Sequence, residues 1–167
     1  ARQAEVATER LLLRPLRMSD AGLIAHYTAD RRVAEGTRSI PHPLPPGAAE
    51  AFVNRAMSPE RDEDVWAIDG SANRLAELLG VVSLTRMEAG QSELGFWIGA
   101  GFWNTGFATE AVAALVAANP HNSRTLFAEA FQDNPGSARV LTNCGFEYLG
   151  DAESWSVARN ARVPTWT

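Results

Sequence analysis

The stretch ELGFWIGAGFWNTGFATEAVAALVAA, residues 93–118, decides the fold of this chain. Its first part, residues 93–98, is rich in aromatic and apolar side chains, which predicts a strand. Glycines between positions 99 and 106 interrupt that pattern and predict a turn. Residues 107–118 are apolar on nearly all sides, which predicts a helix that packs against a sheet. A strand, a glycine-containing turn and a buried helix are therefore expected to follow one another directly.

The segments before this unit predict a strand, two helices and a long irregular loop. The apolar run at 9–14 lies between charged residues and predicts the strand. Residues 21–27 keep helical spacing, and the polar pair at 19–20 can cap the free amides at the start of this helix. A second helix is predicted at 48–57, after the proline-rich loop at 37–47. A loop of this length is often functional.

The remaining segments predict a mostly antiparallel sheet. Strand-like patterns occur at 65–68, 78–85, 93–98, 125–131, 154–157 and 163–167. The first three are separated by turn-prone residues and predict an antiparallel meander. A short helix is predicted at 137–146 and is stopped by Gly145. This order predicts an α/β (α+β) fold in one domain over residues 1–167, with a mixed sheet of about six or seven strands and about four helices.

Composition argues against several classes of function. The formal net charge of −5 argues against a nucleic-acid partner, because such binders usually carry a basic stripe. No run approaches the roughly 18 apolar residues that a membrane span needs, and no basic and then apolar leader precedes the first strand. We therefore expect a cytoplasmic protein with no membrane partner, as a monomer or homodimer. A single cysteine and three scattered histidines offer no metal-ligand spacing, so no metal is expected.

The turn at 103–109 has the chemistry of a phosphate site. The start of a helix presents unpaired amides and a partial positive charge, so a phosphate placed there receives several hydrogen bonds. Gly106 permits a positive φ and a close approach of the backbone, and Ala108 is small. Thr105 and Thr109 add hydroxyl donors. From spacing alone, an ordinary glycine-containing turn into a buried helix explains the pattern equally well.

The sequence around this turn resembles the GNAT superfamily of acetyltransferases, whose phosphate turn is usually written Q/RxxGxG/A before a long helix. Residues 103–108, WNTGFA, keep the glycine and the final small residue but carry Trp103 in place of Gln or Arg. An aromatic residue there is typical of the branch that includes the RimJ/RimL-type ribosomal-protein N-terminal acetyltransferases. Three further segments are similar to segments of that branch and occur in the same order, namely TERLLLRPLRMSDA, ELGFWIG and DNPGSARVLTNCGF. The resemblance covers nearly the whole chain.

The resemblance implies that acetyl-CoA is the co-substrate. In the family, the strand before the turn splays from its neighbour, and its free backbone groups pair with the pantetheine arm and polarise the thioester carbonyl. The residues that it implies for coenzyme A are Phe96, Trp97, Ile98, Trp103, Asn104, Thr105, Gly106, Phe107, Ala108, Thr109, Asn134 and Ser137. Core packing is an alternative for Phe96 and Trp97, and we expect it for at least one of them because strand neighbours face opposite sides.

Two residues are candidates for proton transfer in catalysis. The resemblance places Ser137 near the thioester sulfur. Leu141 stands where many family members carry a tyrosine acid, which leaves Ser137 as the acid candidate. Asn134 and Ser137 also suit a turn and a helix cap. Glu93 lies where related sequences place a strand carboxylate beside the acceptor amine, and it is either a base acting through water or the polar face of an alternating strand.

Other reactive side chains carry weaker signals. His26, His42 and His121 are isolated, and only His42, in the long loop, is a candidate to border the acceptor site. Cys144 has no adjacent base and is interpreted as a small packed side chain. The acidic cluster at 60–64 either attracts a cationic acceptor or forms a solvated turn.

Proton arithmetic bears on the acceptor. An α-amino group is about 10 to 20% neutral at pH 7, whereas a lysine side chain is roughly 0.04% neutral. Without an obvious strong base, the chain is expected to acetylate an α-amine such as a peptide N-terminus, although the branch also contains enzymes for small amines. The alternative is a non-catalytic acyl-CoA-binding domain. Another nucleotide-binding fold is disfavoured, because no GxGxxG follows a first strand and no GxxxxGK[ST] occurs.

Overall fold

The computed structural model describes residues 3–88 and 90–167. Its strands are β1 (Val6–Ala7), β2 (Leu12–Pro15), β3 (Glu63–Asp69), β4 (Gly80–Arg86), β5 (Gln91–Ile98), β6 (Thr125–Ala128), β7 (Ala130–Phe131), β8 (Asp151–Ser156) and β9 (Ala161–Trp166). Its α-helices are α1 (Ala21–Thr28), α2 (Arg31–Glu35), α3 (Ala48–Met57), α4 (Phe107–Ala118) and α5 (Pro135–Asn143). Short 3₁₀ helices are η1 (Met18–Asp20), η2 (Ser71–Asn73) and η3 (Ala100–Phe102).

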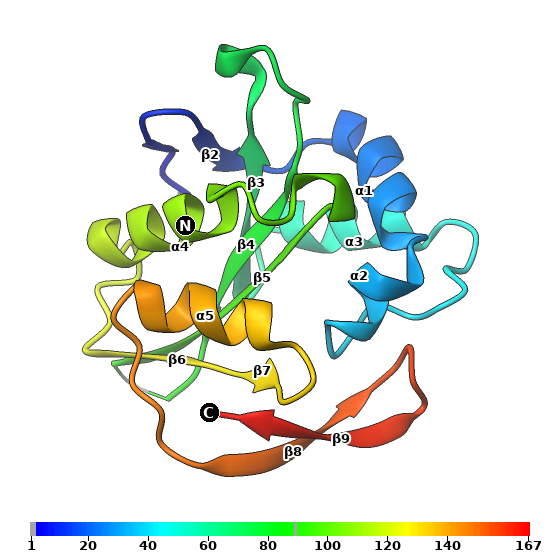
Figure 1. Cartoon of the computed structure of the whole chain (residues 1–167). Coiled ribbons are helices and arrows are strands. Elements are labelled where there is room, and N and C mark those ends of the chain that lie inside the picture. Colours follow the sequence, from blue (N-terminus) through cyan, green and yellow to red (C-terminus); the bar gives the residue numbers. More distant parts are fainter. Residues whose placement is uncertain (1–2, 89) are drawn as a thin grey trace.

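The strands form two sheets. The larger sheet has six strands in the order β1-β2-β3-β4-β5-β6, and the smaller has three in the order β7-β9-β8 (Figure 1). Strands β1 to β5 pair antiparallel, and β6 pairs parallel to β5. The mixed α/β fold and the antiparallel meander of β3, β4 and β5 are therefore confirmed.

Strands β5 and β6 share only the first half of β5. Their register runs from Gln91 opposite Thr125 to Leu94 opposite Ala128. Beyond Leu94, β5 continues to Ile98 with β4 alone as its described partner, while the chain after β6 joins β9 in the smaller sheet. The two strands therefore diverge, and the second half of β5 turns a free backbone edge toward the opening, as the resemblance implied.

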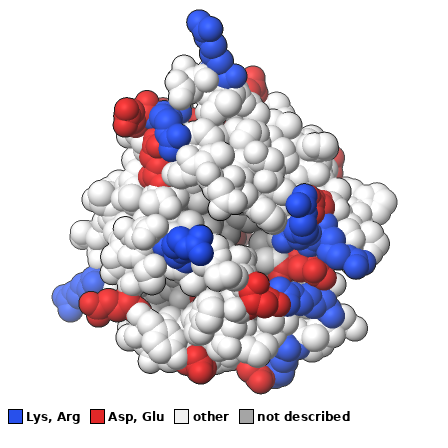
Figure 2. Space-filling model, in the orientation of Figure 1, with Lys and Arg blue, Asp and Glu red and all other residues white. Residues whose placement is uncertain are grey.

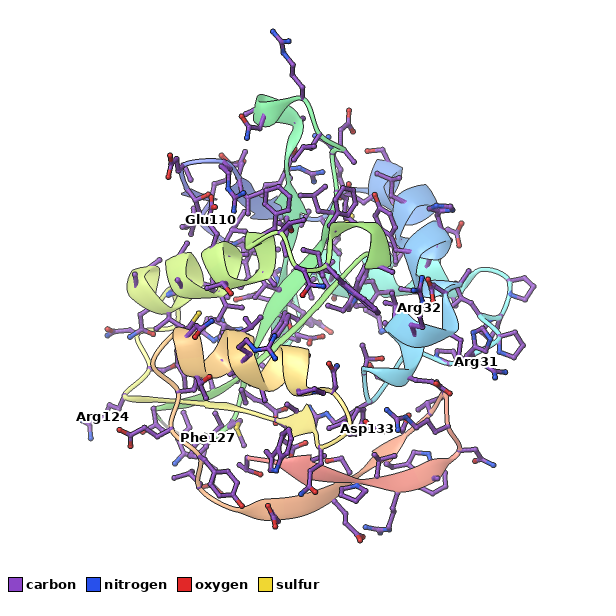
Figure 3. The ribbon with its side chains drawn as sticks, viewed as in Figure 1. Arg31, Arg32, Glu110, Arg124, Phe127 and Asp133 are labelled. Carbon is purple, nitrogen blue, oxygen red and sulfur yellow. The ribbon has the colours of Figure 1, made fainter. Side chains whose placement is uncertain are left out.

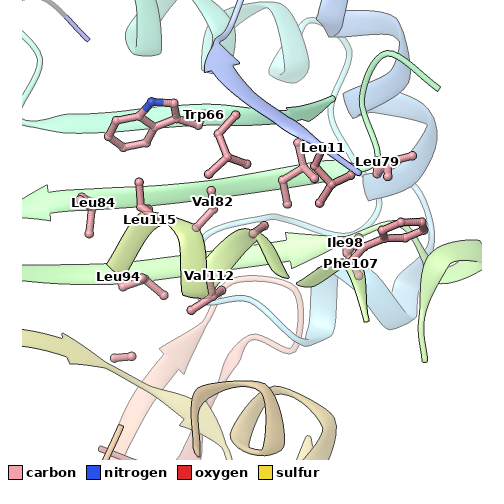
Figure 4. Close-up of a cluster of buried hydrophobic side chains, with 14 of the residues drawn as sticks. Leu11, Trp66, Leu79, Val82, Leu84, Leu94, Ile98, Phe107, Val112 and Leu115 are labelled. Atoms are coloured by element: carbon pink, nitrogen blue, oxygen red, sulfur yellow. The ribbon is translucent and has the colours of Figure 1, made fainter. Parts of the chain in front are cut away.

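Alternation along the central strands fills two cores on opposite faces of the large sheet. Trp66 and Ile68 of β3 pack with α4 and α5 on one face, where Val112 and Leu115 cover the strands (Figure 4). The remaining apolar side chains of β3 pack with α1 and α3 on the other face. The predicted burial of 107–118 on a sheet is confirmed, and its helix positions the turn that precedes it.

Gly80 sets the position of the end of β5. A Cβ atom added at this glycine would lie 2.2 Å from the carbonyl oxygen of Trp97 and 2.7 Å from the Cα atom of Ile98. Any larger residue would force these two backbone segments apart. The absence of a side chain at Gly80 thus lets β4 hold the last residues of β5 close, just before the turn.

The structure corrects four local predictions. Helix α2 was not predicted; Asp30 caps it by accepting a hydrogen bond from the Arg32 amide at 2.9 Å. The predicted strand at 125–131 is broken between β6 and β7, because its two halves join different sheets. The polar pair at 19–20 does not cap α1 through a side-chain hydrogen bond. The helix predicted at 137–146 runs from Pro135 to Asn143.

Asp20 has a different role from the predicted cap. Its carboxylate accepts hydrogen bonds from Nη1 and Nη2 of Arg14 at 2.9 and 2.8 Å. The Nε of Arg14 donates to Asp69 at 2.8 Å, and all three side chains are buried. Burial alone would raise the pKa of the Asp69 carboxyl, but the bond from Arg14 and those from Ser71 lower it. This buried ion pair set joins β2, η1 and β3.

Two classes of feature do not occur in the described part of the chain. Over residues 3–88 and 90–167, no helix has the length and apolar character needed to cross a membrane. Over the same residues, no three His, Cys, Asp or Glu side chains are grouped so that they could hold a metal ion.

Candidate active site

A cleft opens where β5 leaves β6, and we call it the turn cleft. It has a volume of about 560 Å³ and lies between the second half of β5, the turn before α4 and the start of α5, with α2 at its margin. Figure 2 shows this face of the molecule hollowed near its centre, with basic and acidic side chains around the hollow. Among the residues predicted for coenzyme A, the cleft is lined by Phe96, Trp97, Ile98, Trp103, Asn104, Thr105, Gly106, Ala108, Thr109, Asn134 and Ser137.

The turn before α4 is shaped to receive an anion. Asn104 has a φ of 61° and Gly106 a φ of 83°, so the backbone is left-handed at two of the last three positions before the helix begins. The first hydrogen bond of the helix runs from the Glu110 amide to the Gly106 carbonyl at 3.0 Å. The amides of residues 107–109 therefore precede the helical ladder and are available to a ligand. A phosphate group fits this backbone cradle.

Three side chains of the turn serve its internal structure. The indole Nε1 of Trp103 donates to the carbonyl of Ile98 at 3.0 Å and ties the turn to the end of β5. The Thr105 hydroxyl donates to the Phe102 carbonyl, so its proton is already used inside the turn. The side chain of Phe107 is 8% exposed and packs in the core, which leaves only its amide for the cleft.

Glu110 braces the turn against the N-terminal segment. Its carboxylate accepts hydrogen bonds from the Thr8 hydroxyl at 2.5 Å, from the Arg10 amide at 2.9 Å and from the Arg10 Nε at 2.7 Å. Arg10 also lies over the Phe107 ring, 4.3 Å from its centroid. Figure 3 shows Glu110 near the start of α4, on the side of β2. Burial would raise the pKa of Glu110, but these hydrogen bonds and the charge of Arg10 lower it.

A second cavity, which we call the loop cavity, lies on the other side of β5. It has a volume of about 260 Å³ and is bounded by the loop after α2, by α1 and α3, and by the central strands. It shares lining residues with the turn cleft, namely Gly36, Thr37, Phe96, Trp97 and Ser137. A ligand in one space can therefore reach a ligand in the other at this junction.

An arginine from the long loop bridges two carboxylates in the loop cavity. Arg38 donates to Glu93 at 2.5 Å and to Glu129 at 3.3 Å, and Glu129 also accepts from the Ser154 hydroxyl at 2.7 Å. Burial would lower the pKa of the Arg38 guanidinium, but Glu93 and Glu129 raise it. Glu129 lies at the break between β6 and β7, so the break brings a second carboxylate to the side chain of Glu93.

The C-terminal hairpin fastens the segment around α2. The guanidinium of Arg159 donates to the Glu35 carbonyl at 2.8 Å and to Asp133 at 3.0 Å. The amide of Val157 donates to the carbonyl of Arg38 at 3.0 Å. Bonds from Arg159 and the charge of that group lower the pKa of the Asp133 carboxyl. The hairpin of β8 and β9 thus holds the backbone at Glu35 and Arg38, which lies at the margin of both the turn cleft and the loop cavity.

Comparison with known proteins decides the family. The model of the acetyltransferase (GNAT) domain matches residues 10–147. This chain belongs to the GNAT acetyltransferase family. An uncharacterized N-acetyltransferase, p20, of Bacillus licheniformis is 24% identical over 170 residues, which cover 95% of this chain and 91% of that protein.

Solved structures share the GNAT fold over nearly the whole chain. A GNAT-family acetyltransferase from Bacillus anthracis is similar with a TM-score of 0.80 and 20% identity, covering 98% of this chain and 95% of that one. RimL, a ribosomal L7/L12 α-N-protein acetyltransferase solved with coenzyme A, is similar with a TM-score of 0.78 and 16% identity, covering 98% and 96%. As a GNAT enzyme, this chain is an acyltransferase with acetyl-CoA as its co-substrate.

The two candidate residues for proton transfer line the turn cleft and the loop cavity. Ser137 lines both, and Glu93 lines the loop cavity. The Asn134 side chain caps α5 by accepting from the Ser137 amide at 3.4 Å, so the cap is Asn134 and not Ser137. Phe96 packs against the α4 core and Trp97 against the α1 and α3 core, which confirms that these neighbours face opposite sides.

Among the described residues, no histidine and no cysteine lines either space. His42 does not line the loop cavity within the described chain, although the nearby Pro41 and Leu44 do. The side chain of His121 is 4% exposed, with Nε2 at 2.7 Å from Asp64 and Nδ1 at 3.0 Å from the Ser92 hydroxyl. Asp64 thus belongs to a buried ionic group and not to a solvated turn. Cys144 lies partly buried beside the Thr109 carbonyl, and burial raises the pKa of its thiol.

Proposed function

We propose that this GNAT enzyme acetylates the α-amine of a protein or peptide N-terminus, by direct attack of the amine on acetyl-CoA bound in the turn cleft. The observation that carries the proposal is the junction of the two spaces. The turn cleft and the loop cavity share Phe96, Trp97 and Ser137 on opposite sides of the free end of β5. A thioester and an amine can meet there without an acyl-enzyme intermediate.

The donor occupies the turn cleft in this proposal. Its pyrophosphate lies on the amides of residues 107–109 and against Gly106, where the backbone approaches without a side chain. Its pantetheine arm follows the free edge of β5 toward Ser137. A backbone amide of this edge donates to the thioester carbonyl and stabilises the oxyanion that forms on attack. The carbonyl of Ile98 is already bound by Trp103, which fixes the edge before any ligand arrives.

The acceptor amine enters through the loop cavity. The neutral amine attacks the carbonyl carbon and forms the new C–N bond, and the tetrahedral intermediate collapses by breaking the C–S bond. The extra proton of the amine passes through water to the carboxylate of Glu93. The departing thiolate accepts a hydrogen bond from the hydroxyl of Ser137, and its proton comes from water through that hydroxyl, so Ser137 ends the cycle protonated. A thiol with a pKa near 8.5 is a good leaving group, so this last transfer adds modestly to the rate.

Two features support an α-amine as acceptor. Glu93 is the candidate base, and a carboxylate is too weak a base to deprotonate lysine efficiently at neutral pH, whereas an α-amine is already about 10 to 20% neutral. The turn carries Trp103, the aromatic residue typical of the RimJ/RimL branch. RimL acts on a protein α-amine and has the same fold. We assign this chain to that branch on these grounds.

A panel of acceptors tests the proposal. The enzyme is mixed with acetyl-CoA and with a peptide that begins with Ala or Ser, and free thiol is followed in time. The matched control is the same peptide with a blocked N-terminus and one free lysine. We expect turnover on the free α-amine to exceed that on the lysine peptide at least roughly tenfold. The pKa values of the two amines differ by about 2.5 units, so the α-amine has the far larger neutral fraction. Equal turnover on both peptides, or turnover on small amines only, would refute the α-amine assignment.

A further inference from the structure

Arg32 lines the turn cleft but does not belong to the turn before α4. It is on α2 and lines the cleft opposite the turn before α4. Its guanidinium carbon lies 5.3 Å from the centre of the Trp103 ring. Trp103 itself is held by the bond from its indole Nε1 to Ile98. The arginine therefore rests on an aromatic platform that is fixed at the mouth of the turn.

Asp30 sets the direction of the Arg32 side chain. Its two carboxylate oxygens accept hydrogen bonds from Nε at 3.1 Å and from Nη2 at 2.7 Å, and the same group caps α2 through the Arg32 amide. Among the described residues, Nη1 of Arg32 makes no hydrogen bond. A guanidinium has five donors in a rigid plane, so it can serve one carboxylate and one phosphate together. The side chain is 67% exposed, and a ligand can reach it.

We propose that Arg32 binds the pyrophosphate of acetyl-CoA and that Trp103 holds it in place; this inference rests on the proposed donor position. The usual first residue of the turn is Gln or Arg, and this chain has an indole there. In this chain the polar group comes instead from Arg32 of α2. It stacks on Trp103, the residue that stands in place of the usual Gln or Arg. Arginine is suited to the task, since it pairs with phosphate oxygens in two parallel hydrogen bonds and stacks on aromatic rings.

The other arginines of the cleft are less well placed for this role. All three guanidinium nitrogens of Arg159 already donate, to the Glu35 carbonyl and to Asp133, whereas within the described chain Nη1 of Arg32 does not. Arg139 is on α5, across the cleft from α2, and makes no described ring contact with the turn. Arg32 alone of the three contacts a side chain of the turn itself, through Trp103. Its reach to the pyrophosphate is therefore built into the fold.

Calorimetric binding measurements on the whole chain test the proposal without acetyl transfer. The probes are coenzyme A, 3′-dephospho-coenzyme A, which keeps the pyrophosphate, and pantetheine, which has no phosphate. We expect Arg32→Ala to weaken the first two equally and roughly tenfold, because it removes a charge-assisted hydrogen bond, and to leave pantetheine unchanged. Arg31→Ala is the matched control and should change none of them, because Arg31 does not line the cleft and lies on the side of α2 away from α4 (Figure 3).

Each other outcome overturns the proposal. An equal loss for pantetheine would show that Arg32 only supports the local structure. A loss for coenzyme A that disappears with the dephospho form would place Arg32 on the 3′-phosphate. No loss for any probe would leave Arg32 and Asp30 as a surface ion pair. Because binding is measured directly, the result stands even if the enzyme proves to have an acceptor other than an α-amine.

Discussion

The turn cleft and the loop cavity differ in what forms them: mainly backbone on the donor wall of the first, and side chains in the second. The wall of the turn cleft that carries the free strand edge, the turn with two left-handed residues and the start of α4 is formed by backbone, all within residues 95–109, and α2 and α5 close the other side. The loop cavity depends on side chains from α1, the long loop, α3, five strands (β3, β4, β5, β7 and β9), the break after β6 and the start of α5. In the proposed function, backbone recognition suits a donor shared by many enzymes, and the side chains of the loop cavity select the acceptor. Variants in the two spaces should therefore fail in different ways.

The largest expected effect is in the turn cleft. Gly106→Val should abolish measurable binding of coenzyme A, because Gly106 has a φ of 83° and a branched side chain would occupy the surface that meets the phosphate. Its Cβ would also lie 3.3 Å from Nη2 of Arg10. Calorimetry measures the loss, and circular dichroism checks that the variant is folded. Gly101→Val, where no atom lies within 4 Å of an added Cβ, is the control and should bind normally. A folded Gly106→Val that binds coenzyme A would break the comparison.

The next effect belongs to the loop cavity. Glu93→Gln should lower kcat about 100-fold with the KM for acetyl-CoA unchanged, because general base catalysis typically contributes that much or more. Steady-state kinetics with the α-amine peptide measures it. Glu129→Gln is the matched control, since it removes the other carboxylate bound by Arg38 and should cost far less. If both variants lose activity to the same extent, the charge balance of Arg38 and not a base at Glu93 governs the rate.

A smaller effect is expected where the two spaces join. Ser137→Ala should lower kcat between about twofold and tenfold, because the thiolate of coenzyme A leaves readily without a proton. The KM for acetyl-CoA should stay the same. The substitution keeps the backbone amide that Asn134 caps, so the start of α5 is preserved. Rates are measured at saturating peptide. A fully active variant would reduce Ser137 to a lining residue, and a loss of affinity would move it to the donor side.

The smallest effect on activity concerns the brace of the turn. Glu110→Gln should destabilise the protein by about 2 kcal/mol at pH 7, through loss of charged hydrogen bonds, while weakening coenzyme A only two- to threefold. The pKa of Glu110 is lowered on folding, so its contribution is present above the unfolded pKa of about 4.3 and is lost as the pH falls through the folded value. Urea unfolding of both proteins from pH 7 to below pH 4 should show the difference shrink in acid. A constant difference would contradict the ionic role.

The fold could largely be predicted from sequence where the pattern is local and strong. The meander, α4 and its turn follow from strand patterns, glycine positions and an apolar run. Helix α2 was missed because five residues give almost no periodic signal and Asp30 is its main mark. The break in 125–131 was missed because the apolar alternation is continuous there. Only the pairing of β6 with β5 and of β7 with β9 shows that the two halves belong to different sheets.

The site divides in the same way. Most of the residues predicted for the donor line the turn cleft together, because they are neighbours along the chain. Arg38 and Glu129, which flank Glu93, carry no local signal, and the roles of Arg10 and Glu110 as a brace were equally hidden. Thr8 and Arg10 belong to TERLLLRPLRMSDA, a segment that carries the family resemblance, and Glu110 follows the turn, but neither segment signals that these side chains contact one another.

The sequence by itself determined the backbone features of this protein: the glycine turn, the long buried helix behind it and the family that shares them. These follow from local rules, since φ, helix start and strand alternation depend on neighbouring residues. Only the tertiary structure decided which charges face one another in the loop cavity, and that Arg32 of α2 rests on Trp103. Side chains from distant segments meet through packing and sheet register, and no local pattern encodes those meetings.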